Sequence, residues 1–360
     1  PLEFVGIPPL LGWQGIIPSK ARKMAAISVD ATISKIGTVS EIFGQIDPKV
    51  LASHIIETVE PRVEEYVDEL MLKEHATFWE NLPTPMRQMV YDRVRKSAPD
   101  LVDNLVDDLA TNIEELLDIK GMVIDQLAED KILLNRIFLE CGDKEFRFII
   151  NSGAWLGFGF GIIQMAVWYF FKNWWILPIA GLIVGYATNW FALKLIFRPI
   201  HPTPVLCGLF VLQGAFLRRQ KEVSEKFSKL NVELFCNAKN LWEEMMHGRL
   251  REDFGELVMR NTRHFTDVTL GPAKPIATLV LGPEAYGRMR EHIAEQLVRE
   301  LPKCVPCSYA YQDGALEVEN TVCVAMKGLP PDEFEGVLHP VFEEDEIKLI
   351  VIGGCLGALD

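Results

Sequence analysis

The sequence predicts an all-α membrane protein in which a transmembrane helical hairpin stands between two duplicated amphipathic helical domains. Three observations predict this: two adjacent apolar stretches, a second half that repeats motifs of the first, and apolar positions spaced three or four residues apart in the polar segments. We expect the domains at residues 1–143 and 200–345, the hairpin at 144–199, and the start of a further transmembrane helix at 346–360.

The two apolar stretches define the hairpin. Residues 148–171 contain no charged residue, and residues 175–197 contain only Lys194. A helix needs about 20 apolar residues to cross the roughly 30 Å hydrocarbon core of a bilayer. Both stretches are long enough, and because only residues 172–174 separate them, we predict that they run antiparallel.

Motifs recur at a nearly constant offset. Gln14-Gly15 and Gln213-Gly214, 199 residues apart (from 14 to 213), are each followed by basic residues. The segment 117–123 matches 316–322 at the same offset, and Gly153-Ala-Trp-Leu-Gly157 matches Gly353-Gly-Cys-Leu-Gly357 at an offset of 200 (from 153 to 353). Such self-similarity indicates a duplication. By this correspondence we expect further membrane passes beyond both ends of the chain.

The segments outside the hairpin have the pattern of amphipathic helices. Apolar residues recur at helical spacing in residues 48–73 and 101–137, opposite a face rich in carboxylates, and Asp47 is placed to cap the first of these helices. Residues 221–260 and 284–301 have the same pattern. Asp313-Gly314 is a turn signal, so we expect a short hairpin or loop within 303–320.

Charge gives an orientation and excludes one class of partner. A net charge of −14 argues against nucleic acid, whose phosphates would be repelled. The turn between the apolar stretches holds only Lys172, so the positive-inside rule places both domains on the cytoplasm, matrix or stroma side of a bacterial plasma membrane or an endosymbiont-derived organelle membrane. The juxtamembrane basic residues are Lys20, Arg22, Lys23, Arg147, Arg198, Arg218 and Arg219.

Small and polar residues within the spans are the candidate functional residues. Glycines at four-residue spacing let helices approach closely, and polar groups in lipid mark either interhelical hydrogen bonds or a transport path. We expect the first role for these residues and keep transport as the alternative. The set is Gly153, Gly157, Gly161, Gln164, Gly181, Gly185, Thr188, Asn189 and Lys194.

The sequence contains none of the catalytic or cofactor-binding motifs that would identify an enzyme. Its seven histidines form no HExxH pair, and it has no P-loop. Cys304-Val305-Pro306-Cys307 has no second CxxC beside it, so we expect an unpaired loop feature and not a metal site. His339-Pro340 beside residues 343–345 is the best acid–base cluster, and we expect it to be structural. We therefore predict no catalytic residues, no cofactor and no metal.

One segment resembles a known family. The run from Gly185 through Thr188-Asn189-Trp190 and Lys194 to Arg198-Pro199 is similar to the signature of the YheB/YjiN-like membrane proteins. Residues 336–346 and 12–18 resemble the elements that precede and follow a membrane pass in that family, although Gly214-Ala-Phe-Leu departs from its Ile-Pro element. The resemblance implies a polytopic membrane topology and brings no activity, cofactor or catalytic residue with it.

These features lead to one functional hypothesis and one alternative. The first is a non-catalytic integral membrane scaffold, tether or accessory subunit whose partners are the lipid bilayer and other membrane proteins. The alternative is a transporter or channel, or a lipid-handling protein, that uses the polar residues of the membrane helices.

Overall fold

The computed structural model describes residues 5–7, 11–13, 38–205, 210–270 and 282–359, together with Arg22, Lys23, Ala26 and Val29. The chain divides into two compact units, each built from segments of both halves of the sequence. We call them the long-helix unit (Pro1–Ile36, Val123–Leu234 and Glu319–Asp360) and the bundle unit (Gly37–Met122 and Phe235–Val318).

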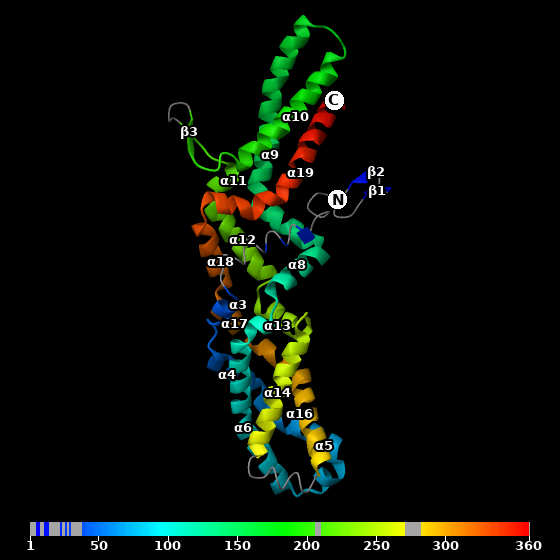
Figure 1. Ribbon diagram of the computed structural model, residues 1–360, viewed down its shortest axis with the longest axis vertical. Helices are drawn as coiled ribbons and strands as arrows, with labels where there is room; N and C mark the ends of the chain where they lie inside the picture. Colours follow the sequence, from blue (N-terminus) through cyan, green and yellow to red (C-terminus); the bar gives the residue numbers. More distant parts are fainter. Residues whose placement is uncertain are drawn as a thin grey trace. The chain divides into compact units, whose positions relative to one another are not determined.

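The bundle unit is helical throughout its described part (Figure 1). Its elements are α3 (Val39–Phe43), α4 (Pro48–Val59), η1 (Glu60–Arg62), α5 (Val63–Asn81), α6 (Thr84–Thr111), α7 (Ile113–Leu116), α13 (Ala238–His247), α14 (Arg251–Leu270), α16 (Pro283–Cys304), η3 (Val305–Ser308) and α17 (Tyr309–Leu316).

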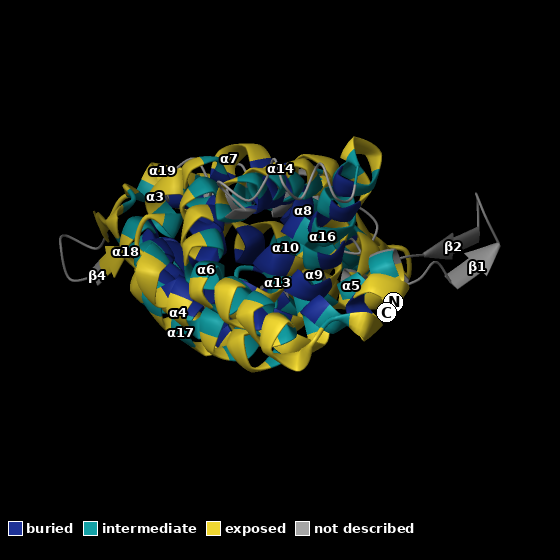
Figure 2. Ribbon diagram, turned by 90° about the horizontal axis from the view of Figure 1, so that it is seen from below, coloured by how far each residue is buried: buried dark blue, intermediate teal, exposed yellow. Residues whose placement is uncertain are grey.

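Caps and amphipathic faces explain why these segments form helices. The predicted cap of α4 is confirmed, because the Asp47 carboxylate accepts a hydrogen bond from the Lys49 amide at 2.9 Å. Asn237 caps α13 in the same way through the Asn240 amide. Figure 2 shows buried and exposed stripes along α4 and α6, as expected for helices with one face in a core.

The core of α5 and α6 includes an aromatic pair tied to a carboxylate. Trp79 is 1% exposed and packs edge-on against Tyr91 at 5.9 Å between ring centroids. The Trp79 indole donates to Asp68 Oδ1 at 2.8 Å, and the Tyr91 hydroxyl donates to the same oxygen. Burial, followed by this hydrogen bond, raises the pKa of Tyr91 to about 12. The polar ends of both rings are thus satisfied inside the core.

A second core contact joins α13 to α17 through a chain of buried polar groups. The Trp242 indole donates to Gln312 Oε1 at 2.8 Å, and Gln312 Nε2 donates to the Ser308 hydroxyl at 2.7 Å. Ser308 in turn donates to the Val305 carbonyl at 2.7 Å. A buried network of this kind is stable only when its members are paired, and each of these three side chains has a partner.

Two sequence predictions for the bundle unit are wrong. Residues 303–320 form no hairpin or loop, because η3 and α17 continue α16. Asp313 accepts from the Ala238 amide at 2.6 Å and so stabilises the N-terminus of α13, and the chain turns at Glu317, whose φ is 40°. Residues 101–137 form no single helix either: α6 ends at Thr111, where the Asn112 amide group bonds the Asp108 carbonyl.

The long-helix unit is organised around three helices, α9 (Lys131–Phe170), α10 (Ile176–Phe197) and α19 (Pro331–Leu359), which are labelled in the upper part of Figure 1. Its elements are β1 (Val5–Ile7), β2 (Leu11–Trp13), α8 (Ile119–Glu129), whose first turn belongs to the bundle unit, α9 (Lys131–Phe170), α10 (Ile176–Phe197), β3 (Thr203–Val205), β4 (Phe210–Leu212), α11 (Ala215–Arg218), α12 (Gln220–Leu234), α18 (Val318–Gly328) and α19 (Pro331–Leu359).

The predicted all-α class is confirmed for the described residues, in which β1–β2 and β3–β4 form two small antiparallel pairs. Within the described part of the chain, two helices are long and apolar enough to cross a membrane: residues Leu139–Phe170 of α9, and α10. They coincide with the two predicted apolar stretches. Helix α9 begins earlier than its apolar part, at a cap where Asp130 accepts from the Ile132 amide.

We predict that Gln312→Leu lowers the stability of the bundle unit by about 1–3 kcal/mol, because the Trp242 indole loses its acceptor inside the core. Thermal unfolding followed by circular dichroism measures the change. Gln88→Leu is the matched control, since Gln88 is exposed on α6. Equal melting temperatures for the two variants would contradict the role given to this network.

Candidate functional site

Helices α10 and α19 touch through their backbones. A methyl group built on Gly181 would overlap the carbonyl of Gly357, and one built on Gly185 would overlap the carbonyl of Gly353. The overlapped atoms belong to the backbone, so a side chain here would push the helices apart. Both glycine pairs are spaced four residues apart, which is the arrangement that lets two helices pack at closest approach.

A hydrogen bond joins the same two helices. The Asn189 amide lies against Gly353 and donates from Nδ2 to the Leu349 carbonyl at 2.9 Å. Asn189 stands one helical turn beyond Gly185, so the small residues create the space in which its amide reaches α19. An interhelical bond of this kind contributes about 0.6–2 kcal/mol within a bilayer.

The other polar residues of α10 also make contacts within the protein. The Thr188 hydroxyl donates to the Val184 carbonyl at 2.9 Å. The Lys194 ammonium lies 5.0 Å from the centroid of the Trp190 ring, in the last turn of α10, where a cation is favoured by the helix dipole. Both contacts lie within α10 itself.

The glycines of α9 are placed differently. No atom lies within 4 Å of the position that a methyl group would take on Gly153, Gly157 or Gly161. These residues share one side of α9, whereas Gly159, equally open, points to the opposite side because it is two residues away in the helix. Glycines at four-residue spacing therefore occur in α9, α10 and α19, and those of α10 and α19 pack against each other.

An apolar groove lies between α9 and α10 near their connecting turn. Its volume is about 320 Å³, and Gln164 supplies the only amide side chain among the lining residues. By helical spacing Gln164 follows Gly153 and Gly157 along the same side of α9. The lining residues are Phe160, Ile163, Gln164, Val167, Trp175, Ile176, Ile179, Ala180, Ile183 and Val184.

Below the glycine contact, buried rings hold α10, α11 and α19 together. Phe216 stacks on Phe334 at 5.2 Å between centroids and lies 5.9 Å from Phe197. The His339 ring packs on Phe197 at 4.5 Å, and its Nδ1 lies 3.1 Å from the buried Glu335 carboxylate. Arg198 approaches the same carboxylate at 3.5 Å. The histidine that the sequence offered for acid–base chemistry thus has structural contacts; the side chains of 343–345 lie outside the described residues.

A four-residue ion-pair network joins α9 to α12. Arg219 contacts Glu145, which is 5% exposed, and Glu222 at 2.9 Å, and Lys144 pairs with Glu222 at 2.6 Å. Hydrogen bonds from Arg219 and then from Lys144 lower the pKa of Glu222 to about 2. Arg219, predicted only as a juxtamembrane cation, is therefore an internal link between two helices.

The other juxtamembrane cations that the structure describes lie at the surface. Arg147 is exposed beside Asp143 at 3.1 Å, and Arg22 lies 3.6 Å from Asp125. Arg218 ends α11 and is exposed. Lys20 lies outside the described residues.

The two cysteines of the CxxC sequence do not lie in a loop. Cys304 ends α16 and is buried, while Cys307 stands in η3 and donates its thiol to the Cys304 carbonyl at 2.8 Å. Burial raises the pKa of the Cys304 thiol, which disfavours the reactive thiolate. Among the described residues, no group of three or more His, Cys, Asp or Glu side chains is arranged to hold a metal ion.

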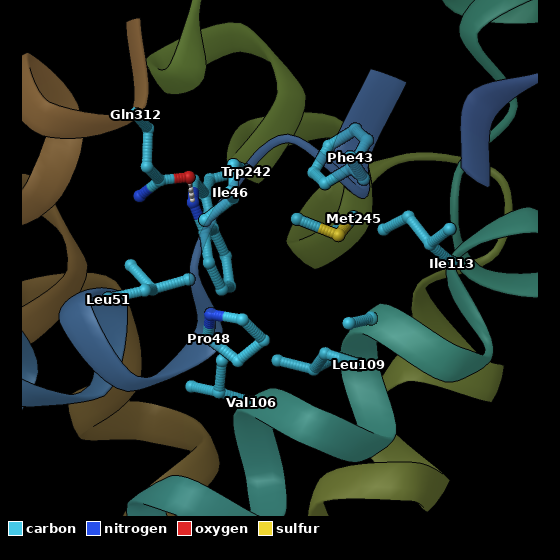
Figure 3. Close-up of a pocket in the computed structure, with 11 residues that line it drawn as sticks. Phe43, Ile46, Pro48, Leu51, Val106, Leu109, Ile113, Trp242, Met245 and Gln312 are labelled. Atoms are coloured by element: carbon cyan, nitrogen blue, oxygen red, sulfur yellow. Dashed lines mark hydrogen bonds between the residues drawn. The ribbon is translucent and has the colours of Figure 1, made fainter. Parts of the chain in front are cut away.

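The bundle unit contains a small cavity of about 30 Å³, shown in Figure 3. Its lining is apolar apart from Gln312, whose amide bonds Trp242. A cavity of this size accommodates about one water, so it is a packing gap and not a ligand site. The lining residues are Phe43, Ile46, Pro48, Leu51, Val106, Leu109, Ala110, Ile113, Trp242, Met245 and Gln312.

Comparison of the chain with models of protein families, with curated proteins and with solved structures finds no match. The site therefore has to be interpreted from its own geometry. Sequence reasoning selected Gly181, Gly185 and Asn189 but did not identify what they would contact. The four-residue spacing of Gly353 and Gly357 was the signal that could have revealed their partner.

We predict that Gly185→Ala destabilises the protein by about 1–3 kcal/mol, because the added methyl group overlaps a backbone carbonyl of α19. Gly159→Ala, at an uncrowded position on the side of α9 opposite Gly157, is expected to be neutral or slightly stabilising, since alanine favours a helix over glycine. Thermal unfolding in one detergent compares the two variants. A melting temperature for Gly185→Ala equal to or above that of the wild type would refute the close contact.

Glu222 should make stability depend on pH in the acid range. Its pKa is about 2 in the folded protein, below the roughly 4.3 of an unfolded chain, so its stabilisation is complete above about pH 5 and is lost as the pH falls toward 2. At pH 7 we expect Glu222→Gln to unfold at a lower temperature than the wild type. The loss of stability should be less than about 1 kcal/mol, because the ion pair of Glu222 is partly exposed. This difference between the variant and the wild type should close as the pH falls toward 2. Glu295→Gln at an exposed position is the control, and a gap that did not change with pH would contradict the assignment.

Proposed function

We propose that this protein is an integral membrane scaffold, tether or accessory subunit of a larger membrane assembly, and that α9 and α10 form its transmembrane hairpin. Large apolar side chains on these helices support the membrane placement. Trp155 is 77% exposed, Ile150 71% and Phe158 69%, and a contiguous surface of this kind is unfavourable in water.

The ends of the hairpin support an orientation in which the helical domains lie on the cytoplasm-like side. Trp174 and Tyr169, at the connecting turn, are 82% and 70% exposed, as aromatic residues at a membrane interface are. Lys172 is the one cation of that turn, whereas Lys144, Arg147 and Arg198 stand at the other ends of the helices. The predicted further membrane passes and the duplication belong to this proposal.

The observation that carries the assembly role is the open glycine side of α9. Gly353 and Gly357 of α19 pack directly against the glycines of α10. Gly153 and Gly157 stand at the corresponding positions of the predicted repeat, with no atom in reach. In lipid, helices associate through such close packing and through hydrogen bonds. We infer that another transmembrane helix packs on this side of α9.

The role is proposed to be non-catalytic. The ionisable groups described around the base of the hairpin support this, because they form ion pairs between helices, including Arg219 with Glu145 and Arg198 with Glu335. Such pairs fix the position of neighbouring elements.

Transport is the second candidate, and one observation favours it. Gln164 lines the groove between α9 and α10 in a region where the other lining residues are mainly apolar. Polar groups in such a position can mark a path through the membrane. Under the assembly hypothesis, the Gln164 amide would instead form a hydrogen bond with a helix packed beside Gly157.

The decisive test is purification of the full-length protein from native membranes in mild detergent, with its mass measured and co-purifying proteins identified. We expect a large assembly with stoichiometric partners. Gly157→Leu should reduce partner recovery at least tenfold, whereas Gly159→Leu, the same change on the opposite side of α9, should retain it.

Recovery of a lone monomer or small homo-oligomer, unaffected by Gly157→Leu, would overturn the assembly role. Flux measurements in liposomes would then decide the second candidate. Loss of flux in Gln164→Ala, with flux retained in Gly159→Leu, would establish transport.

A further inference from the structure

A small β-hairpin follows α10 directly. Strands β3 and β4 pair antiparallel, with Pro204 opposite Val211. Three hydrogen bonds hold the base of the hairpin: the Gly214 amide donates to the Pro199 carbonyl at 3.0 Å, Gln213 Nε2 to the Ile200 carbonyl at 3.1 Å, and Thr203 Oγ1 to the Leu212 carbonyl at 3.2 Å. The hairpin is therefore fixed at the end of α10, beside which β3 projects in Figure 1.

The composition of the hairpin is unusual for a surface element. No charged residue occurs between residues 202 and 217. Val211 is 63% exposed and Leu212 is 41% exposed, so these two side chains of β4 present apolar surface. An isolated two-stranded hairpin is at best marginally stable in water, and edge strands at protein surfaces usually carry charges that keep other molecules away.

Basic residues complete the pattern. Two exposed cations, Arg218 and Lys221, follow the uncharged segment, whereas Arg219 between them is paired with Glu145 and Glu222. Arg218 is exposed at the end of α11. Apolar residues followed by cations are typical of segments that lie in a membrane interface, since the apolar side chains enter the acyl boundary and the cations face anionic headgroups.

The same order of elements occurs near the N-terminus. Strands β1 and β2 form a hairpin with Gly6 opposite Gly12. Residues 4–19 are uncharged, and Lys20, Arg22 and Lys23 follow them. Both hairpins are followed by a glutamine and a glycine, Gln14-Gly15 and Gln213-Gly214. An apolar hairpin before a basic cluster is thus a feature that the chain uses twice.

We propose that the β3–β4 hairpin inserts into the interfacial layer of the bilayer around α10, with phospholipid as its partner. The inference rests on the proposed membrane placement of α9 and α10. Phospholipid is favoured over a protein partner because the hairpin is fixed at the end of a membrane-length helix, next to the exposed Lys194 and Arg198. Insertion at this level would hold the end of α10 at a constant depth.

The test places a photoreactive benzoyl-phenylalanine at residue 211 of the full chain, reconstituted in vesicles of phosphatidylcholine and phosphatidylglycerol. Irradiation followed by intact-mass measurement detects a covalent phospholipid adduct. The matched control is residue 324 of α18, because Val324 is 62% exposed against 63% for Val211. Residue 155 on α9 is the positive control. We expect at least tenfold more lipid adduct at 211 than at 324.

The outcomes separate the inference from the proposal on which it rests. Lipid adducts at 155 without adducts at 211 would overturn the interfacial hairpin alone, as would cross-linking of 211 to protein. Absence of lipid adducts at 155 would overturn the membrane placement of α9 and, with it, the hairpin inference.

Discussion

The contact on which the long-helix unit depends is the meeting of two glycine pairs, Gly181 and Gly185 of α10 with Gly353 and Gly357 of α19. Because no side chain separates the backbones, dispersion contacts act at the shortest possible distance, and the Asn189 amide reaches a carbonyl of the neighbouring helix. The requirement is strict. A single methyl group on either glycine of α10 would have to displace backbone atoms, which packed helices resist.

At the base of the α9–α10 hairpin the contacts between helices differ in chemistry from the glycine contact, because their surroundings are different. There the helices are joined by stacked rings around Phe216 and by ion pairs around Arg219 and Glu335. Partly buried charges are favourable only when paired, so these residues define the relative positions of α9, α10, α12 and α19 more than they add net stability. The same helices are thus joined by apolar close packing in the proposed bilayer region and by paired charges beside it.

Much of the fold follows from local sequence. The apolar stretches predicted α10 and the second part of α9, since charge-free runs of that length have few alternatives. Asp47 was identifiable as a cap because a cap depends on neighbours a few residues away. The turn expected at Asp313-Gly314 failed for the opposite reason: a carboxylate that accepts from Ala238, far away in sequence, holds the segment in a helix. The sequence likewise predicted Arg219 only as a juxtamembrane cation, because its partner Glu145 lies 74 residues away in the chain.

The candidate site was predictable in composition but not in pairing. Four-residue glycine spacing identified the segments of α9 and α10 as helices capable of close approach. The same spacing at Gly353 and Gly357 was used only as a sign of duplication, so the partner of α10 was not predicted. Which helices meet depends on the segments of the chain that connect them. The glycines of α10 and α19 are in contact, whereas the glycine side of α9 is open. This open side is the basis of the proposed assembly role.

The most direct measurement of that role is a photo-cross-link from residue 154, which neighbours Gly153 and Gly157 on α9, made in the native membrane and read out by peptide mass spectrometry. We predict an adduct with an apolar helix from another protein that carries small residues four apart and an asparagine one turn beyond, as α10 does. Adducts with phospholipid alone would contradict it.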